Sequence, residues 1–351
     1  MTHSRHLATV LSRSYPWVTA PFLVSAPMRV MAGPALAVSV SQAGGLGFLG
    51  PGVKTQDLLA DLQDTSDRIK ALPQRVSFSE RSLLPVGVGF QLWSDDLDIA
   101  ITAIERFKPC AAWLYAPREG PGEYDVWSRR IRTVSAQTQI WIQIGTLAEA
   151  RELLHSQELP DVIVVQGAEA GGHGRAHDGL GLITLLPEVA DLVAGRVPLF
   201  AAGGIADGRG AAAALCLGAS GVVMGTRFLA SEEARISGGY QQEIIRASDG
   251  AASTTRTLLY NHLRGTMGWP SHYSPRTITN RSFVEHQQGR PFAELKALHD
   301  EALKAGDQGW GPAGRLATYA GASIGLIHEV KSAATTVREI QEEVRAKLPS
   351  L

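Results

Sequence analysis

The chain has 351 residues, with 33 basic and 34 acidic side chains and a formal net charge of -1. This balance gives no electrostatic footprint for nucleic acid, and an apolar content of 44% with only 19% charged residues excludes intrinsic disorder. The length suits one α/β barrel of about 250 residues with additions. Glycine is over-represented, at 37 residues, or about a tenth of the chain against about 7% in average proteins.

The N-terminal region contains an uncharged run from Val30 to Val53, which has to be tested as a membrane span. Six glycines and two prolines interrupt the run, so it predicts a loop, a short helix and a strand. Arginines but no acidic residues precede Asp57, which is a weak mark of a mitochondrial transit peptide. The first expected strand begins near Phe22 and leaves little room for such a peptide, so we expect a cytoplasmic protein with no membrane partner.

Short apolar runs alternate with segments of helical period from Phe22 to about Ser248, as in repeated βα units. The runs are continuously apolar, which is typical of parallel strands covered on both faces, and eight of them favour a closed (β/α)8 TIM barrel. The expected strands are 22–28, 46–50, 86–93, 110–116, 139–145, 161–167, 197–205 and 221–228. Expected helices include 57–72, 124–138, 146–157 and 208–219, the last with Gly218 as its C-cap.

The strand pattern stops after Ser248, and residues 250–291 show no clear period, so they predict a lid insertion. A C-terminal helical extension is expected at Phe292–Ala305, Gly314–Val330 and Ala333–Leu348. No linker divides the chain, so we expect a single domain over 1–351, with the barrel in 20–249 and the lid and helices in 250–351. Three lid aromatics either line a pocket or pack on the barrel rim: Tyr260, Trp269 and Tyr273.

The two cysteines, Cys110 and Cys216, lie far apart in apolar surroundings. We therefore expect small core residues and neither a disulfide framework nor a metal site.

Chemistry in such a barrel belongs at the C-terminal ends of the strands. The glycines concentrate there, in APMRVMAGP after strand one, QGAEAGGHGR after strand six, and AAGGIADGRG and GVVMGTRF at strands seven and eight. The last two loops commonly hold a phosphate, because glycines let backbone amides approach a ligand. The predicted phosphate cradle consists of Gly203, Gly204, Gly225 and Thr226; tight turns without a ligand are the plainer alternative.

His173 is the best catalytic candidate, because it stands in a Gly-Gly-His-Gly segment after strand six and histidine exchanges a proton near neutral pH. His177 lies four residues on, but the glycine-rich segment argues against a helix and no third ligand is evident, so no metal is expected. Glu169 is either a second acid or base or, more plainly, a helix cap or a partner of Arg175.

Together these segments resemble the nitronate monooxygenases, FMN-dependent enzymes formerly called 2-nitropropane dioxygenases. APM with AGGLGF, EAGGHGR, AAGGI and VMGTRF occur in the family's order over residues 20–230, with an echo in YAGASIGLI at 319–327. The resemblance implies FMN as cofactor, and a small-molecule substrate and O2 as partners.

The resemblance also implies a role for each matching position. It places Ala26, Pro27 and Met28 against the flavin ring, Gly172 beside the cofactor, Gln91 and Gln143 as polar contacts to the flavin, and Gly203, Gly204, Gly225 and Thr226 at the phosphate. His173 corresponds to the family's catalytic base. Many relatives carry lysine where this chain has Gln143, so a positive charge near the flavin is missing at that position.

The implied reaction is the oxidation of nitronates or nitroalkanes to a carbonyl compound and nitrite. His173 would either remove the proton α to the nitro group or hold an anionic nitronate by a hydrogen bond. The nearest alternative is an FMN-dependent NAD(P)H reductase acting on a quinone or an enoyl thioester. The others are a flavin-free phosphate-binding lyase or isomerase, and an inactive flavin-binding relative.

Overall fold

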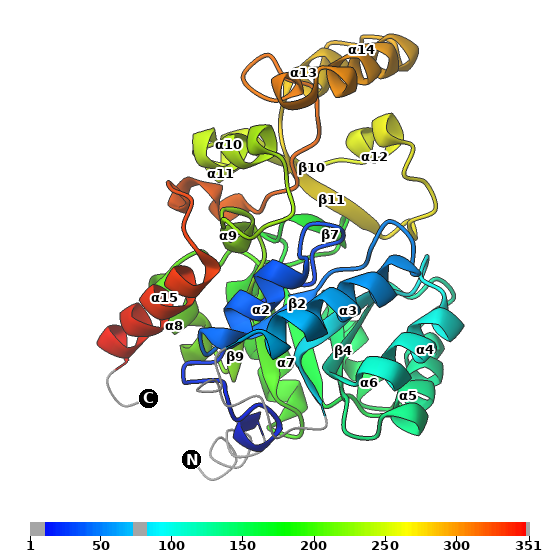
Figure 1. The fold of residues 1–351 in the computed structure, drawn as a ribbon. Helices are drawn as coiled ribbons and strands as arrows, with labels where there is room; N and C mark the ends of the chain where they lie inside the picture. Colours follow the sequence, from blue (N-terminus) through cyan, green and yellow to red (C-terminus); the bar gives the residue numbers. More distant parts are fainter. Residues whose placement is uncertain (1–10, 73–82, 349–351) are drawn as a thin grey trace.

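A computed structural model describes residues 11–72 and 83–348 of the chain. Eight parallel strands close into a barrel surrounded by helices (Figure 1), which confirms the predicted TIM barrel. The barrel strands are β1 (Leu23–Ser25), β2 (Leu46–Leu49), β3 (Leu84–Gln91), β4 (Pro109–Tyr115), β5 (Gln139–Ile144), β6 (Val162–Gln166), β8 (Leu199–Ala202) and β9 (Gly221–Met224). The helices around them are α2 (Pro34–Gln42), α3 (Asp57–Lys70), α4 (Leu97–Phe107), α5 (Gly122–Val134), α6 (Leu147–Leu153), α7 (Leu182–Val193), α8 (Gly208–Cys216) and α15 (Ala333–Lys347).

Alternate residues of the barrel strands face two different cores, which explains why the strand sequences are continuously apolar. On β6, Val164 belongs to the cluster inside the barrel, whereas Ile163 belongs to the layer between strands and helices. Aromatic rings fill the interior, with Trp141 centred 4.6 Å from Phe200. Glycine makes room for them, because a Cβ atom on Gly221 would lie 2.4 Å from the Phe200 ring.

The last helix around the barrel comes from the C-terminal end of the chain. α15 packs against α2 and α8, and it buries Val337, Ile340 and Val344 on one face. From the same helix Gln341 donates hydrogen bonds to backbone carbonyls on either side of β1. The residues between β9 and α15 are therefore an insertion into the barrel.

This insertion forms a second layer above the C-terminal ends of the barrel strands, at the top of Figure 1. Its elements are α9 (Thr226–Leu229), α10 (Gly238–Arg246), α11 (Gly250–Ser253), β10 (Thr254–Arg256), α12 (Leu259–Arg264), β11 (Tyr273–Ile278), α13 (Arg281–Gln287), α14 (Phe292–Lys304), η1 (Gly306–Gly309) and η2 (Ala322–Leu326). The strands β10 and β11 form an antiparallel sheet, in the order β10-β11-β7, with β7 (Gly172–Arg175) from the loop after β6.

Two predictions for this second layer are wrong. The strand pattern does not stop at Ser248, because β10 and β11 follow it; neither has an apolar run, and β11 contains Pro275. The predicted helix 314–330 is absent apart from the short η2, because Tyr319 is extended and forms an isolated bridge with Thr277. The predicted helix 292–305 is confirmed as α14.

Some of the smaller predictions are confirmed and one is wrong. Cys110 is buried as expected, but Cys216 is exposed because it is the last residue of α8 and lies on its outer side. Gly218 follows that helix with a left-handed φ of 107°, as expected for a residue that ends a helix. Among the described residues, no helix combines the length and the apolar character needed to cross a membrane.

Candidate active site

His173 lies where the three-stranded sheet β10-β11-β7, which we call the lid sheet, meets the C-terminal ends of the barrel strands. The insertion between β9 and α15 is called the lid below. It belongs to β7 and is paired with Pro275 of β11. Its carbonyl oxygen accepts hydrogen bonds from Tyr115 Oη at 3.0 Å and from Gln166 Nε2 at 3.3 Å. Tyr115 and Gln166 are the last residues of β4 and β6. Two barrel strands therefore fix the backbone of His173.

The lid holds the imidazole ring itself. Trp269 stacks on it, with ring centroids 3.6 Å apart and planes inclined by 4°. Asn261 Nδ2 lies 2.9 Å from His173 Nε2. Tyr319 Oη lies 3.4 Å from the amide oxygen of Asn261 and accepts a hydrogen bond of 2.7 Å from Arg264. No local sequence feature marks Asn261, because its contact with His173 joins residues 88 positions apart.

Burial, and then the positive charges of Arg256 and Arg264, lower the pKa of His173 from 6.5 to about 3. The imidazole is therefore neutral at pH 7. The residue type alone suggests titration near neutral pH, but this imidazole does not titrate there.

Two arginines of the lid sheet lie against the glycine-rich loop that follows β6. Arg256 donates to the carbonyl oxygens of Gly172 at 3.2 Å and Ala170 at 3.1 Å, and Arg276 donates to that of Ala168 at 3.2 Å. In the described part of the chain, no carboxylate oxygen lies within 4.0 Å of either guanidinium. Burial, together with Arg276, lowers the pKa of Arg256 to about 10. Sequence reasoning missed this positive pair, although Arg is frequent in the lid.

The four residues of the predicted phosphate cradle lie directly after β8 and β9. Gly203 and Gly204 have left-handed φ values of 101° and 73°, and Gly225 precedes Thr226 at the start of α9. Among the described residues, the amide N–H groups of these four residues have no hydrogen-bond acceptor. All four residues are half-buried and so remain reachable by a ligand.

The strand-one segment lies beside this cradle. A Cβ atom on Gly225 would lie 3.6 Å from Met28 Sδ and 3.8 Å from Ala26 Cβ. Pro27 fits against β3 only because residue 89 is glycine, whose Cβ would lie 2.3 Å from the Pro27 ring. The structure thus brings the ends of β1 and β9 together, as the glycine clusters predicted.

The two predicted polar contacts lie at the ends of separate strands. Gln91 ends β3, and its side-chain Oε1 accepts from Arg29 at 2.9 Å. Gln143 is buried on β5, and its side-chain Oε1 accepts from Trp113 Nε1 at 3.1 Å. Neither glutamine contacts His173. Their amide NH2 groups have no acceptor among the residues described, so both remain available as donors.

Other candidates take the plainer roles. Both carboxylate oxygens of Glu169 accept from Leu182 N, at 3.0 and 3.1 Å, at the start of α7. Glu169 is therefore a helix cap, and Arg175 pairs elsewhere. His177 is exposed, and over residues 11–72 and 83–348 no group of three His, Cys, Asp or Glu side chains could hold a metal ion.

The lid aromatics divide between the two predicted roles. Tyr260 is fully buried, and its hydroxyl donates to Asn280 Oδ1 at 3.0 Å, so it packs within the lid. Trp269 covers His173, whereas Tyr273 lines a different hollow.

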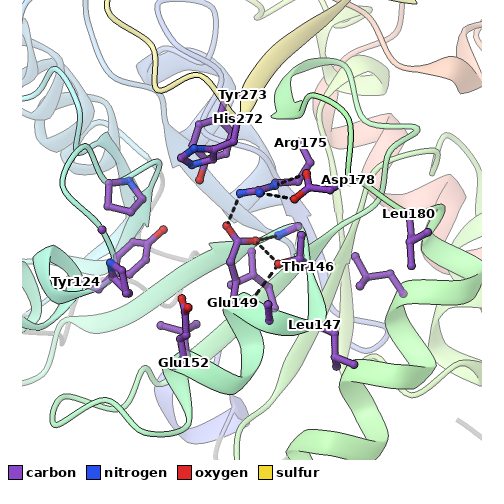
Figure 2. A pocket seen from close by; sticks show the side chains of 18 of the residues that line it. Tyr124, Thr146, Leu147, Glu149, Glu152, Arg175, Asp178, Leu180, His272 and Tyr273 are labelled. Carbon is purple, nitrogen blue, oxygen red and sulfur yellow. Dashed lines mark hydrogen bonds and ion pairs between the residues drawn. The ribbon is translucent and has the colours of Figure 1, made fainter.

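That hollow is a cavity of about 560 Å³ between the loops after β4, β5 and β6 (Figure 2). Arg175 crosses it, with Nη1 3.1 Å from Glu149 and Nε 2.8 Å from Asp178. The cavity contains neither His173 nor any predicted cofactor residue. Tyr273 lines the cavity, and its ring centroid lies 6.0 Å from that of Trp269, which stacks on the imidazole.

Comparison with known proteins identifies relatives of the whole chain. The family model described as nitronate monooxygenase matches residues 15–76 and 129–343. A nitronate monooxygenase named npaC from Metarhizium robertsii is 56% identical over 342 residues, covering 97% of this chain and 96% of that protein. A nitronate monooxygenase from Neurospora crassa is 32% identical over 363 residues, covering 98% of this chain and 94% of that protein.

Solved structures agree with the observed fold. The structure of a nitroalkane oxidase from Streptomyces ansochromogenes superposes with a TM-score of 0.71 at 25% identity, covering 94% of this chain and 97% of that one.

Proposed function

The chain belongs to the nitronate monooxygenase family of flavin-dependent oxidoreductases, and from this premise we propose that it uses FMN and O2 to convert nitronates or nitroalkanes into a carbonyl compound and nitrite. In the net conversion, one O2 supplies the carbonyl oxygen atoms of two product molecules, and each nitrite leaves with the electron pair of the broken C–N bond; a neutral nitroalkane also releases its α-proton.

The observation that carries the choice of FMN is the cradle of amides without acceptors. Gly203, Gly204, Gly225 and Thr226 present four N–H donors at the ends of β8 and β9, a place where barrels of this type hold a phosphate. The cradle adjoins the loop before His173, because a Cβ atom on Gly203 would lie 3.0 Å from Ala170 Cβ. A phosphate held here would leave the rest of a flavin mononucleotide to extend toward His173.

The remaining predicted residues would contact the flavin along that path. Ala26, Pro27 and Met28 form one wall, and Gly172 leaves open space beside it, since no atom lies within 4 Å of the Cβ position on Gly172. The free amide groups of Gln91 and Gln143 would donate to polar atoms of the ring. When bound, FMN supplies the redox chemistry by accepting electrons from the substrate and passing reducing equivalents to O2.

His173 would orient the substrate and manage its proton. Its ring plane is fixed by Trp269, and its neutral form is favoured by burial. The positive charges of Arg256 and Arg276 would stabilise an anionic nitronate, a task that the neutral Gln143 cannot perform. The packing of the lid on the C-terminal end of the barrel would exclude water from the reacting atoms.

The test is an absorbance spectrum of the purified protein, followed by anaerobic mixing with the nitronate of 2-nitropropane and, separately, with NADH. We expect a yellow protein that releases FMN on denaturation and is bleached by the nitronate. Bleaching by NADH alone would establish the reductase alternative, and a colourless protein that takes up no added FMN would establish a flavin-free one.

The cytoplasmic location also remains a prediction. Fractionation of cells that express the untagged chain, with antibody detection, would test it; recovery in the mitochondrial fraction would contradict it.

A further inference from the structure

We propose that Trp113 is a positioning residue: it fixes the side-chain amide of Gln143 as a hydrogen-bond donor to the FMN ring, and this donor favours the reduced cofactor over the oxidised one. The inference rests on the proposed function, because it needs a flavin at the C-terminal end of the barrel. It adds to that function a residue of the barrel interior that sets how readily the cofactor accepts electrons.

The side chains that face the barrel interior at the C-terminal end fall into a polar half and a small half. Residues alternate along a strand, so each of these side chains points the same way as the residue two positions before it. Four neighbouring strands, β3 to β6, present the polar half: Gln91, Tyr115, Gln143 and Gln166. At the ends of β1, β8 and β9 the corresponding residues form the small half: Ala26, Ala202 and Gly225. The phosphate cradle adjoins the small half, so a flavin held there would extend toward the polar half.

Two of the four polar side chains are already used within the protein, and two keep a free donor. Tyr115 and Gln166 donate to the carbonyl oxygen of His173, at 3.0 and 3.3 Å. The amide NH2 groups of Gln91 and Gln143 have no acceptor among the described residues. Gln143 is only 8% exposed, and a buried donor without an acceptor destabilises the folded protein. A ligand that supplies an acceptor, such as the flavin ring, would remove this cost.

The contact between Trp113 and Gln143 decides which end of the amide faces a ligand. Trp113 Nε1 lies 3.1 Å from Gln143 Oε1. An indole N–H group only donates, and so does an amide NH2 group, so the atom opposite the indole has to be the amide oxygen. Reversal of the amide would place two donors against each other. The NH2 group is therefore the end that is left for the cofactor.

The indole of Trp113 is itself held firmly. It is 2% exposed and stacks on Trp141, with ring centroids 5.9 Å apart and planes inclined by 21°. Its other neighbour is Phe48, which it meets edge to face at 5.3 Å. A close-packed ring of this size cannot turn away without opening the barrel interior. The amide of Gln143 is thus oriented before the cofactor binds.

An oriented donor acts differently on the two redox forms of a flavin. Reduction adds electrons to the ring, so its polar atoms become stronger hydrogen-bond acceptors, and bonds to charged acceptors are stronger than bonds to neutral ones. A donor that is already in place therefore stabilises the reduced form more than the oxidised form. We expect Trp113, through Gln143, to favour reduced FMN about tenfold, which corresponds to about 30 mV for a two-electron couple.

The decisive variant is Trp113→Phe, which removes the indole N–H group and keeps an aromatic ring against Trp141 and Phe48. The amide of Gln143 can then reverse, so we expect FMN to stay bound and its reduction potential to fall by about 30 mV, measured by anaerobic titration against a reference dye. Trp141→Phe is the matched control. It removes the N–H group of the neighbouring ring, which donates to Tyr15 Oη at 2.8 Å, and should change the preference for reduced FMN by less than about twofold.

A double-mutant cycle separates positioning from a general effect on packing. Gln143→Met deletes the amide and keeps the length of the side chain, so Trp113→Phe has nothing left to orient in that background. We expect Gln143→Met to lower the potential at least as much as Trp113→Phe, and the double variant to match Gln143→Met. A further fall in the double variant, an unchanged potential in Trp113→Phe, or an equal fall in Trp141→Phe would overturn the inference.

The wild-type holoenzyme gives a second readout that does not depend on the folding of Trp113→Phe. With glutamine side chains labelled with 15N, the amide resonance that is missing in Gln143→Met should shift when bound FMN is reduced. An unmoved resonance in a protein that binds FMN and oxidises the nitronate would overturn the inference and leave the proposed function intact. A protein that takes up no FMN would instead refute the proposed function.

Discussion

Two regions at the same end of the barrel handle arginine in opposite ways. In the cavity of Figure 2, Arg175 meets Glu149 and Asp178, so its charge is balanced by protein carboxylates. Beside His173, the hydrogen bonds that Arg256 and Arg276 donate to described residues go to carbonyl oxygens and a hydroxyl. An arginine without a carboxylate leaves positive potential for an anion to use. The region beside His173, rather than the cavity around Arg175, is therefore the one that leaves positive charge for an anion.

The largest effect is expected when the imidazole is removed. His173→Phe keeps a ring to stack on Trp269 but deletes both nitrogens, so the nitronate loses its oriented donor. We expect FMN to remain bound and kcat/KM for the nitronate to fall on the order of 10²–10³-fold, measured as oxygen uptake. His177→Gln, at an exposed position of the same loop, is the control and should match the wild type. Turnover of His173→Phe at the wild-type rate would remove His173 from the mechanism.

Removing an arginine that has no carboxylate partner tests the comparison of the two regions directly. Arg256→Met deletes a charge that has no described carboxylate within 4.0 Å, so KM for the nitronate should rise about tenfold or more, with a smaller change in kcat. Arg256→Lys keeps the charge and should recover much of the affinity. The exposed Arg246, which pairs with Glu243, offers a matched control as Arg246→Met. An unchanged KM in a folded Arg256→Met protein would show that this charge does not act on the substrate.

The cofactor end of the site can be weakened separately. Gly203→Ala places a Cβ atom 3.0 Å from Ala170 in a residue with a φ of 101°, a conformation that costs an L-residue about 1–2 kcal/mol. We expect FMN affinity to fall about 5–30-fold, measured by fluorescence titration of the apoprotein. Gly210→Ala is the control, since its Cβ would meet Ile205 at an ordinary 3.5 Å. Equal affinity in the two variants would place the phosphate elsewhere.

The parts of the molecule that these variants change differ in how far the sequence predicts them. Each of the eight expected apolar runs overlaps a barrel strand, because burial on both faces leaves a continuous apolar sequence, as in Val162–Val165. The glycine clusters pointed to the C-terminal ends of barrel strands for a similar local reason. Gly203 and Gly204 adopt left-handed backbone conformations, and such positions can be recognised from residue type alone.

The lid could not be predicted in this way, because its structure depends on distant partners. β10 reads TTR and pairs with a strand that contains Pro275, and the sheet is completed by the glycine-rich β7 about a hundred residues earlier in the chain. Asn261 and Arg256 carry no local mark of function. Their importance follows from lying beside His173 and its loop, which only the folded chain shows.

Acid stability offers a smaller effect on the same site. The folded protein lowers the pKa of His173 from 6.5 to about 3, so between these values the unfolded chain binds a proton that the folded chain does not. Stability should therefore fall as the pH falls through this window, by up to about 1.4 kcal/mol per pH unit from this group. Urea unfolding at several pH values would measure the slope. His173→Phe should lack this contribution, and an unchanged slope in that variant would show that His173 is not kept neutral.

The smallest effect is expected in the balanced region. Asp178 is 55% exposed on its side chain and pairs with Arg175, which keeps Glu149 when Asp178 is lost. Because an exposed ion pair is worth about 0.2–1 kcal/mol, Asp178→Asn should lower thermal stability only slightly. KM for the nitronate should stay within about twofold of the wild type, because the cavity that Asp178 lines does not include His173 and salt screens exposed charges. A tenfold change in KM would mean that the balanced charges of the cavity do reach the substrate. The two regions would then form one continuous electrostatic site.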